Sequence, residues 1–416
     1  MNIASGGRGS IAVIGAGAAG AMAAIAAAER GARVTLIEGT ADGGRKILIS
    51  GGGRCNILPG ALQEERFVTD SSPNTLRLLL RSWPLREQRA FFDQELRLGL
   101  TLEPESGKLF PASNRARDVR DGLIDLARAR GVELRFGTRC QAIAPSGAGW
   151  RVEIAGGIPL EAAAVILATG GLSVPATGSD GWGLAAARRL GHAINPTYAA
   201  LTPLTANPAM HADLSGVSLT ATLSASGGGR SAVATGGFLF THRGYSGPSV
   251  LDVSHVVVRA MQEGAPASLK VLWGVRDAGW WEESLKARGS GRVLTLLREE
   301  LPQRLAERLL EEAGIDKEQT MAQLRREERL SLLERLTRYP LAVTGDEGYK
   351  KAEVTGGGVV LGEIDPRTME SRMAPGLFLC GEILDAFGPI GGYNFAWAWA
   401  TGRAAGYGAA ARALAT

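Results

Sequence analysis

Short apolar runs alternate with helix-forming stretches in the first 40 residues of the chain. Residues 11–14 form an uninterrupted apolar run that ends in glycine, as expected of a parallel strand buried on both faces. Residues 21–30 strongly favour a helix, Gly31 ends that stretch, and residues 33–38 are predicted to be the second strand. This order predicts a strand, a helix and a second, parallel strand.

The same patterns predict further elements up to residue 168 and again near the end of the chain. Residues 77–97 and 117–130 are predicted to be helices, and residues 150–154 alternate between apolar and polar, as in an exposed hairpin strand. Residues 132–136 are predicted to be a strand. Apolar stretches predict buried strands at residues 162–168 and 376–380 and a helix over residues 395–406.

The middle of the chain has a different pattern. Residues 196–247 are rich in Thr, Ser, Ala and Gly with alternating apolar positions, which predicts a β-rich region. Residues 280–338 are densely charged and place leucines at helical spacing, which predicts solvated helices. The fold class is therefore predicted to be α/β, with a Rossmann-like nucleotide-binding domain over residues 1–195 and 344–416, interrupted by an insert over residues 196–343 (β-rich at 196–255 and helical at 280–340).

Composition adds modest constraints. The chain has 416 residues, enough for two or three domains, and 57 glycines without a repeat period, so many backbone sites must need positive φ or close approach. The net charge of +4 leaves room for an anionic partner. Residues 77–139 hold 13 basic and nine acidic residues, and this excess of four equals that of the whole chain. A solvated arginine-rich surface is the favoured interpretation, and a phosphate-facing patch is the alternative.

Cysteine usage and hydropathy bear on the location of the protein. Three cysteines, Cys55, Cys140 and Cys380, are too few and too scattered for a disulfide framework or a zinc site, so we expect no metal and a reducing cytoplasm. Residues 11–28 carry no charge, but they are rich in Ala and Gly rather than Leu. We therefore expect no membrane span.

The turn between the first strand and the first helix carries a dinucleotide-binding motif. It matches G-x-G-x-x-G, and an acid follows 18 positions after the last glycine, close to the ~20 expected for the residue that binds a ribose hydroxyl. The motif alone is weak, but it is strong when both strands, the helix and the acid are in register. The residues predicted to bind a nucleotide cofactor are Gly15, Ala16, Gly17, Ala18, Ala19, Gly20, Glu38 and Gly39.

A second glycine-rich segment, residues 45–56, follows the dinucleotide unit. Three consecutive glycines let backbone N–H groups approach a flat ligand without a Cβ in the way. Since the first motif already serves the phosphates, we assign this segment to the isoalloxazine ring of a flavin. Its predicted cofactor contacts are Arg45, Lys46, Ser50, Gly51, Gly52, Gly53, Arg54 and Asn56, with Cys55 beside the reactive ring.

Two later segments complete the predicted FAD site. The strand at 162–168 runs into Thr169, Gly170 and Gly171, and the strand at 376–380 runs into Gly381 and Glu382, whose carboxylate is expected to bind the ribityl or pyrophosphate part of FAD. The helix that begins near Gly392 is expected to direct its N-terminus at the flavin N1–C2=O edge. Contacts are predicted for Gly391, Gly392, Tyr393 and Asn394, whereas Phe395, Trp397 and Trp399 are expected to be core residues.

Only one G-x-G-x-x-G lies between a strand and a helix. A dedicated NAD(P)H domain is therefore not expected, and NADH or NADPH would dock transiently over the flavin.

These motifs resemble those of the BaiN/RdsA-like family of FAD-dependent oxidoreductases. The resemblance rests on the two glycine-rich segments, on residues 240–248 and 354–359 with 368–371, and on Gly381-Glu382 through Asn394. It implies an FAD domain interrupted by a small β-barrel and a helical part, with NAD(P)H as reductant. Members have been assigned reduction of a uridine in large-subunit ribosomal RNA, oxidation of aminoacetone, and a step in bile-acid reduction. Ala386-Phe387 departs from the more polar residues of many members.

The expected reaction is reduction of a C=C bond, with uridine in 23S ribosomal RNA as the favoured substrate. It needs a hydride at C6 of uracil and a proton at C5, and Cys55 is the candidate proton donor, with His242 as a second candidate. The alternatives are that Cys55 is a buried small hydrophobe and that His242 is a satisfied loop histidine. A small metabolite, such as an amine or an enone, is the alternative substrate, and a flavin-bearing RNA-binding protein without turnover is a third hypothesis. The sequence does not predict an oligomeric state.

Overall fold

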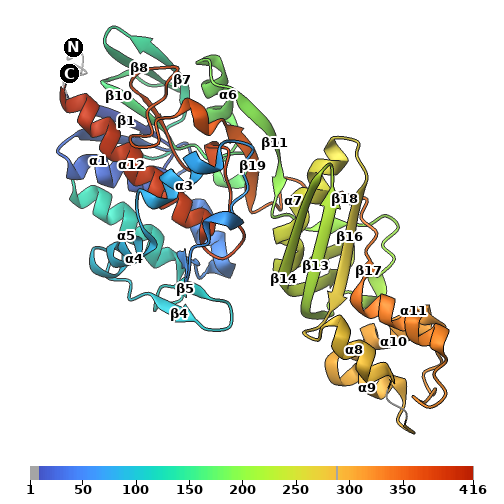
Figure 1. Ribbon diagram of the computed structural model, residues 1–416. Coiled ribbons are helices and arrows are strands. Elements are labelled where there is room, and N and C mark those ends of the chain that lie inside the picture. The colour runs from blue at the N-terminus through green and yellow to red at the C-terminus, as the bar shows by residue number, and fades with distance from the viewer. Residues whose placement is uncertain (1–8, 287–288, 416) are drawn as a thin grey trace. The chain divides into compact units, whose positions relative to one another are not determined.

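The computed structural model describes residues 9–286 and 289–415 (Figure 1), and the chain forms two compact units. The first unit comprises Met1–Thr197 and Val354–Thr416, and the second comprises Tyr198–Glu353. The second unit is therefore inserted into the first. Residues 344–353, which we placed in the first domain, lie in the second unit, where strand β18 (Gly345–Asp346) pairs with β12 (Leu204–Thr205).

A five-stranded sheet forms the centre of the first unit. The strands lie in the order β20-β10-β1-β2-β6, and every pairing is parallel. Because parallel strands are covered on both faces, β1 and β10 read as continuous apolar runs and are buried along almost their whole length. The parallel sheet confirms the predicted Rossmann-type fold. Its strands are β1 (Ser10–Ile14), β2 (Arg33–Ile37), β6 (Glu133–Arg135), β10 (Ala164–Leu167) and β20 (Leu377–Leu379).

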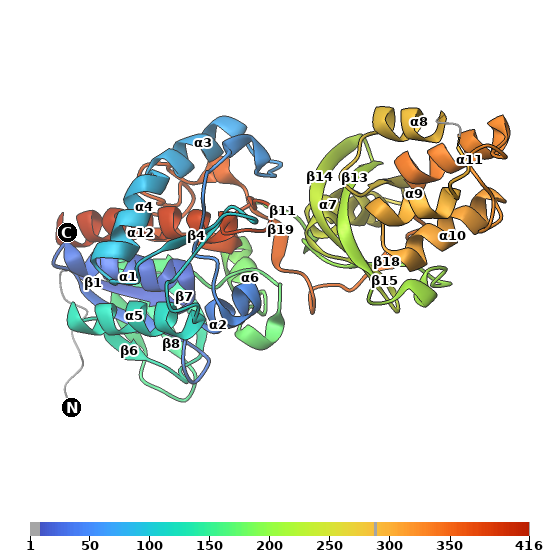
Figure 2. The same ribbon diagram turned by 90° about the horizontal axis from the view of Figure 1, so that it is seen from below.

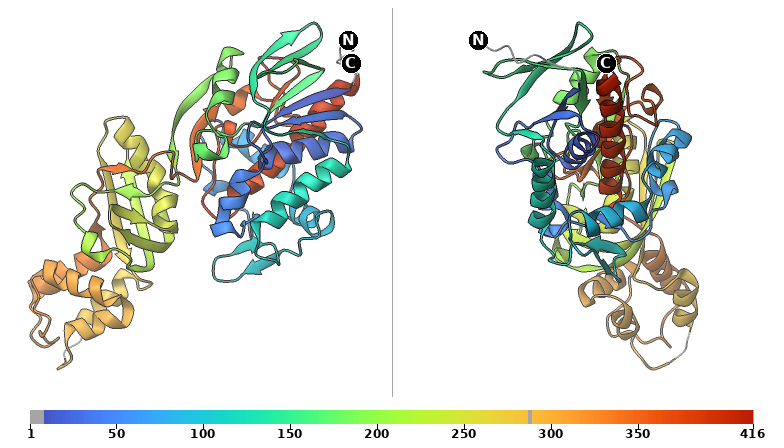
Figure 3. Two further views of the ribbon diagram at one scale, coloured as in Figure 1. Left: turned by 180° about the vertical axis from the view of Figure 1, so that it is seen from behind. Right: turned by 90° about the vertical axis from the view of Figure 1, so that its left-hand side faces the viewer.

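Two helices pack closely beside this sheet, α1 (Ala18–Glu29) and α12 (Tyr393–Ala415), and Figures 2 and 3 show them side by side. Glycines of α12 face small residues of α1. A Cβ on Gly402 would lie 2.4 Å from the carbonyl oxygen of Ala19, and a Cβ on Gly406 would lie 2.4 Å from that of Ala23. The alanine-rich composition of α1 thus serves close helix packing. Although α12 has 23 residues, no helix within 9–286 or 289–415 is long and apolar enough to cross a membrane.

Replacing Gly402 by alanine tests this packing. Alanine has the higher helix propensity, by about 1 kcal/mol, so a solvent-facing site would gain stability from the change. Here the added methyl group would meet backbone, and overpacking of this kind costs about 1–3 kcal/mol. We expect a lower melting temperature in calorimetry, with Gly362→Ala as control because only one atom, 4.0 Å away, lies near a Cβ at Gly362. A higher melting temperature for Gly402→Ala would contradict the close contact.

The remaining elements of the first unit correct one prediction and confirm two. The helix predicted over residues 77–97 is two helices, α3 and α4, because the ring of Pro84 interrupts the backbone hydrogen bonding. The predictions at 117–130 and 150–154 are confirmed as α5 and as β8, whose side chains alternate in burial. The helices are α2 (Arg45–Ile49), α3 (Pro73–Arg81), α4 (Leu85–Gln94), α5 (Ala116–Ala129) and α6 (Trp182–Arg189), with short 3-10 turns η1 (Ser50–Gly53), η2 (Glu64–Arg66), η3 (Pro175–Thr177), η5 (Leu361–Glu363) and η6 (Gly381–Ile383).

Three smaller sheets accompany the parallel sheet. Two are three-stranded and antiparallel, in the orders β3-β5-β4 and β7-β8-β9, and the third pairs β11 with β19 where the chain passes between the units. The strands are β3 (Leu58–Pro59), β4 (Thr101–Glu103), β5 (Lys108–Phe110), β7 (Cys140–Ser146), β8 (Gly149–Ile154), β9 (Leu160–Ala162), β11 (Ile194–Ala200) and β19 (Val354–Val359).

In its described residues, 198–286 and 289–353, the second unit contains a seven-stranded antiparallel sheet and the helices α7 to α11. The order β17-β16-β13-β14-β15-β12-β18 leaves β17 and β18 as its edges in the described part of the chain. Helix α7 lies along the sheet, and α8 to α11 gather at one end of it (Figure 1). The bounds are β13 (Ser218–Gly227), β14 (Arg230–Thr241), β15 (Gly244–Ser246), β16 (Ala267–Trp273), β17 (Tyr339–Pro340), η4 (Ala212–Leu214), α7 (Pro248–Gln262), α8 (Ala278–Lys286), α9 (Val293–Glu300), α10 (Gln303–Ala313) and α11 (Arg326–Thr337).

Candidate functional site

The glycine-rich turn between β1 and α1 has the geometry of a phosphate-binding loop. A Cβ on Gly15 would lie 2.5 Å from the oxygen of Ala168, and a Cβ on Gly20 would lie 1.8 Å from the oxygen of Gly15. These two glycines therefore allow the turn to pack against the end of β10. Gly17 differs, since no atom lies within 4 Å of its Cβ position and no side chain caps α1 there. The space beside Gly17 is thus open, and the N-terminus of a helix is where phosphate oxygens bind.

Two polar side chains lie beside this turn. Glu38 accepts hydrogen bonds from the backbone N–H of Ala16 (2.8 Å) and of Thr40 (2.7 Å), so its carboxylate is held at the turn. Thr169 follows β10, and its Cα would lie 3.1 Å from a Cβ on Gly15. The Thr169 hydroxyl is buried without a hydrogen-bond partner among the described residues, which is unfavourable by about 1–3 kcal/mol. A nucleotide bound at this edge of the sheet would offer it polar partners, so these residues fit the cofactor.

The second glycine segment exposes its backbone. Gly51, Gly52 and Gly53 have φ of +55°, +67° and +85° and are exposed to solvent. Since no atom lies within 4 Å of a Cβ at Gly52, the backbone conformation and not protein packing requires glycine there. An open face of this kind is what a flat ring needs. The assignment of the segment to the flavin ring stays a prediction.

Both arginines predicted in this segment already have acidic partners. Arg45 Nε lies 2.7 Å from Asp42 Oδ1, and Arg54 Nη1 lies 2.9 Å from Glu103 Oε1. The guanidinium of Arg54 also stacks over the ring of Phe110, at 4.1 Å from its centroid. The two arginines therefore hold the glycine-rich segment against Asp42, Glu103 and Phe110.

Cys55 is completely buried and has φ of +61°, which is rare for a residue with a side chain. Its backbone N–H donates to the oxygen of Ser50 at 3.1 Å. Burial raises the pKa of the thiol to about 12, against the smaller opposite effect of a hydrogen bond with the Ser50 side chain. The thiol is thus protonated at neutral pH, as a proton donor must be. Its catalytic role stays a prediction.

Lys46 and Glu382 form an ion pair that the sequence did not predict. Lys46 Nζ lies 2.6 Å from Glu382 Oε2 and donates to Ser173 Oγ at 2.6 Å. Glu382 Oε1 accepts from Ser173 Oγ at 2.5 Å and from the N–H and hydroxyl of Thr355 at 3.0 and 2.9 Å. Burial raises the pKa of Glu382, but Lys46 and these hydrogen bonds outweigh it and hold the pKa below its usual value. Ser173 and Thr355 lie close to the glycine motifs, which is the one signal that could have found them.

Several predicted cofactor glycines also have a role in protein packing. A Cβ on Gly171 would lie 2.4 Å from the hydroxyl oxygen of Thr355. A Cβ on Gly381 would lie 2.7 Å from the Cβ of Ala19. Gly392, at the start of α12, has φ of +94° and would clash with the backbone of Leu58 at 2.4 Å. Positive φ is also required at Gly170 and Gly391. The cofactor contacts of these glycines, and of Gly39, Ser50 and Asn56, stay predictions.

The residues that begin α12 fix the preceding loop. The Tyr393 hydroxyl donates to the oxygen of Ala61 at 3.2 Å, and the Asn394 side chain both accepts from and donates to the backbone of Gly388 at 2.9 Å. Trp397 and Trp399 are buried, as predicted, and their indole N–H groups donate to the oxygens of Gly381 and Ile57. Phe395 is partly buried and stacks on Trp399.

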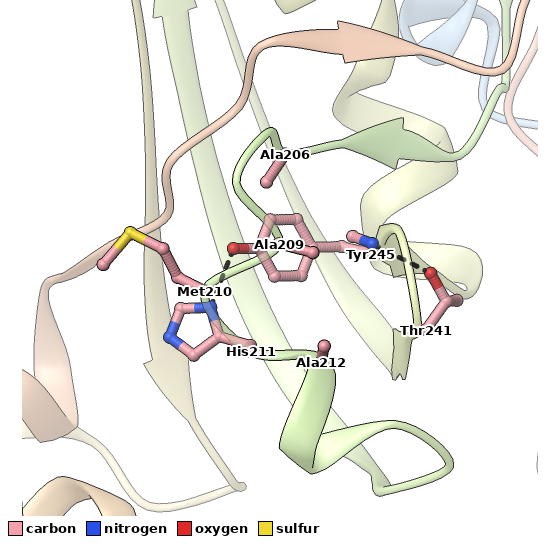
Figure 4. A pocket seen from close by; sticks show the side chains of 8 residues that line it. Ala206, Ala209, Met210, His211, Ala212, Thr241 and Tyr245 are labelled. Carbon is pink, nitrogen blue, oxygen red and sulfur yellow. Dashed lines mark hydrogen bonds between the residues drawn. The ribbon is translucent and has the colours of Figure 1, made fainter.

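His242 belongs to the second unit, on the exposed turn between β14 and β15. The small pocket beside this turn (Figure 4) has no room for a ligand and contains a buried histidine that we did not single out, His211. Its Nδ1 lies 2.9 Å from the hydroxyl of Tyr245 and its Nε2 lies 2.8 Å from that of Tyr339. Burial lowers the pKa of His211, as expected for a histidine in an aromatic core. This geometry does not test the predicted role of His242 as a proton donor, which stays a prediction.

The basic residues of 77–139 are mostly paired with acids. Eight of the 13 lie in ion pairs, which favours the interpretation of a solvated surface over that of a phosphate-facing patch: Arg81, Arg89, Arg115, Arg120, Arg128, Arg130, Arg135 and Arg139.

Comparison with known proteins identifies the family. The profile of the HI0933-like protein Rossmann domain matches residues 9–408. The chain belongs to this family. It is 33% identical over 393 residues to the ribosomal RNA dihydrouridine synthase of Escherichia coli, covering 94% of this chain and 95% of the relative. It is 34% identical over 413 residues to the 3-dehydro-bile acid delta(4,6)-reductase of Clostridium scindens, covering 97% of this chain and 99% of the relative.

A solved structure has the same fold. The 3-ketosteroid delta1-dehydrogenase of Sterolibacterium denitrificans superposes with a TM-score of 0.51 at 14% identity, covering 97% of this chain and 100% of that one. The profile match over residues 9–408 confirms the predicted family. This member of the HI0933-like family is an FAD-dependent oxidoreductase with a Rossmann-type FAD-binding domain.

Proposed function

We propose that this HI0933-like protein reduces a C=C bond with NADH or NADPH as electron donor, and that its substrate is a uridine of 23S ribosomal RNA. One observation carries the proposal: two relatives of nearly equal identity, each aligned over almost its full length, have names that describe reduction of a ring C=C bond. A shared reaction on different rings agrees with a conserved flavin site and a variable substrate pocket. We place the reaction in the cytoplasm, where ribosomes are made.

The residues have separate roles in this proposal. FAD, when bound, would supply hydride chemistry, and the reduction proposed here adds that hydride to C6 of uracil. The N-terminus of α1 and the Gly15–Gly20 turn hold the pyrophosphate, and Glu38 holds a ribose hydroxyl. Cys55 donates the proton to C5, with His242 as second candidate. The nicotinamide docks transiently, because only one dinucleotide motif lies at a strand–helix junction.

Nucleoside analysis of 23S ribosomal RNA from a deletion strain tests the substrate. We expect dihydrouridine to be lost on deletion and restored by the wild-type gene but not by Cys55→Ala. The purified protein with NADPH is also expected to form dihydrouridine in ribosomal RNA taken from the deletion strain. Unchanged dihydrouridine in the deletion strain would exclude this substrate.

A small metabolite is the second candidate substrate, favoured by the similarity to the bile-acid reductase and by the pairing of most basic residues between 77 and 139. It predicts reduction of a free enone, or oxidation of an amine such as aminoacetone with formation of peroxide. Under this alternative, turnover would not depend on RNA, and RNA binding would not weaken as salt is raised.

A further inference from the structure

Four segments that are far apart in the sequence meet at the carboxylate of Glu382. Lys46 comes from α2, Ser173 from the loop after β10, Thr355 from β19, and Glu382 itself from η6. All four lie in the first unit. The ion pair joins residues that are 336 positions apart. The network therefore connects α2 to the centre of the FAD-binding unit.

Both hydroxyl groups of this network donate their proton to Glu382. The Thr355 hydroxyl accepts from the backbone N–H of Leu172 at 2.7 Å and of Ser173 at 3.1 Å, so its proton is donated to Glu382. The Ser173 hydroxyl accepts from Lys46 and donates to Glu382. Glu382 Oε1 has three donors, and Oε2 faces the ammonium of Lys46. A partly buried carboxylate satisfied in this way stays ionised and holds its cation.

Helix α2 depends on such an anchor. It has five residues, too few to be stable alone, and no side chain caps its N-terminus. Its C-terminal end is tied to Cys55, because the Ser50 hydroxyl donates to the oxygen of Ile47 at 2.7 Å and the Cys55 N–H donates to the oxygen of Ser50. A displacement of Lys46 would therefore reach the glycine triplet and Cys55.

We propose that Lys46 and Glu382 are positioning residues whose partly buried ion pair fixes the segment from α2 to Cys55. Glu382 acts on this segment through Lys46, and the direct cofactor contact predicted for Glu382 from the sequence stays a prediction. The proposal deepens the proposed function, since it assumes that this segment faces the flavin. Gly171 packs against the same network, because a Cβ there would lie 2.4 Å from the Thr355 hydroxyl and 3.1 Å from Glu382 Oε1.

The reactivity of Cys55 measures the position of this segment without any substrate. FAD-loaded wild type and variants are treated with N-ethylmaleimide, and alkylation at each cysteine is followed by mass spectrometry. Cys140, which is also buried and lies on β7, is the internal reference for general loosening. In Lys46→Met the uncompensated carboxylate should release α2, and we expect Cys55 alkylation to rise at least about tenfold relative to Cys140.

Companion variants separate the ion pair from nonspecific damage. Glu382→Gln keeps the shape and removes the charge, so it should also raise Cys55 alkylation, and Lys46→Arg should restore most of the protection. The double variant Lys46→Met/Glu382→Gln should be less reactive than Lys46→Met, because no unpaired charge remains. Lys317→Met, which breaks an exposed Lys–Glu pair of 2.8 Å in the second unit, should leave Cys55 unchanged.

Two results would overturn the proposal. One is that Cys55 is alkylated no faster in Lys46→Met and Glu382→Gln than in the wild type. The other is an equal rise in the alkylation of Cys55 and Cys140 in Glu382→Gln, which would indicate general loosening of the protein. Since no RNA is used, an incorrect substrate assignment leaves this experiment unaffected.

Discussion

Apoprotein in which Gly17 is replaced by alanine will melt at the same temperature as the parent, yet its affinity for FAD will be lower by at least about 100-fold. Gly17 has φ of −76°, which alanine adopts freely, and no atom lies within 4 Å of the added methyl group. The methyl group would instead stand before the N-terminus of α1, where the pyrophosphate must approach the backbone. Calorimetry of apoprotein and titration of FAD fluorescence measure the two effects.

Two other glycines provide contrasts. Gly20→Ala would place a methyl group 1.8 Å from the oxygen of Gly15, so it should lower the melting temperature of apoprotein as well as FAD affinity. Gly362→Ala should change neither quantity. If Gly17→Ala bound FAD as tightly as the parent, the pyrophosphate would not lie at this turn.

Replacing Cys55 by alanine has the largest expected effect on turnover. FAD affinity should change by no more than about threefold, whereas reduction of the C=C bond should slow at least about 100-fold, the usual loss when a general acid is removed. Cys55→Gly is the matched variant, because glycine is unstrained at φ of +61° and also lacks the thiol. Loss of turnover in both variants would assign the effect to the thiol, and full activity in either would remove its role as proton donor.

The buried thiols also predict how stability depends on pH. Burial raises the pKa of both Cys55 and Cys140 to about 12, whereas an unfolded thiol ionises near its usual value of about 8.5. Below that value the folded and unfolded states bind equal numbers of thiol protons. Above it only the unfolded state loses them, so the free energy of unfolding should fall by about 1.4 kcal/mol per pH unit for each thiol until the folded pKa is reached. Urea unfolding at several alkaline pH values should give a shallower slope for Cys55→Ala.

The dinucleotide unit was predictable from sequence because its determinants are local. The apolar runs ending at Ile14 and Ile37 became β1 and β2, and the alanine-rich stretch became α1. Gly15 and Gly20 occupy positions that only glycine fits. Most of these properties depend on neighbours within one strand–helix–strand unit, although the close contact of Gly15 is with Ala168 at the end of β10.

The rest of the site depends on which distant segments the sheet brings together. The sequence did not predict the ion pair between Lys46 and Glu382, which forms because β20 pairs with β10. His211 could not be assigned either, since its tyrosine partners are 34 and 128 residues away. Pro84 is the exception, because its effect on the predicted helix is local and could have been read directly from the sequence.

The interrupted architecture has a consequence for how the protein is made on the ribosome. The second unit is one continuous stretch, so it can fold as soon as residue 353 has left the exit tunnel. The first unit cannot, because β20 and α12 are synthesised more than 170 residues after β10. Until then the edge of β10 and the small-residue face of α1 lack their partners, and α2 lacks the carboxylate that anchors it. The nascent chain must therefore protect an open strand edge throughout synthesis of the insert, until β20 has been made.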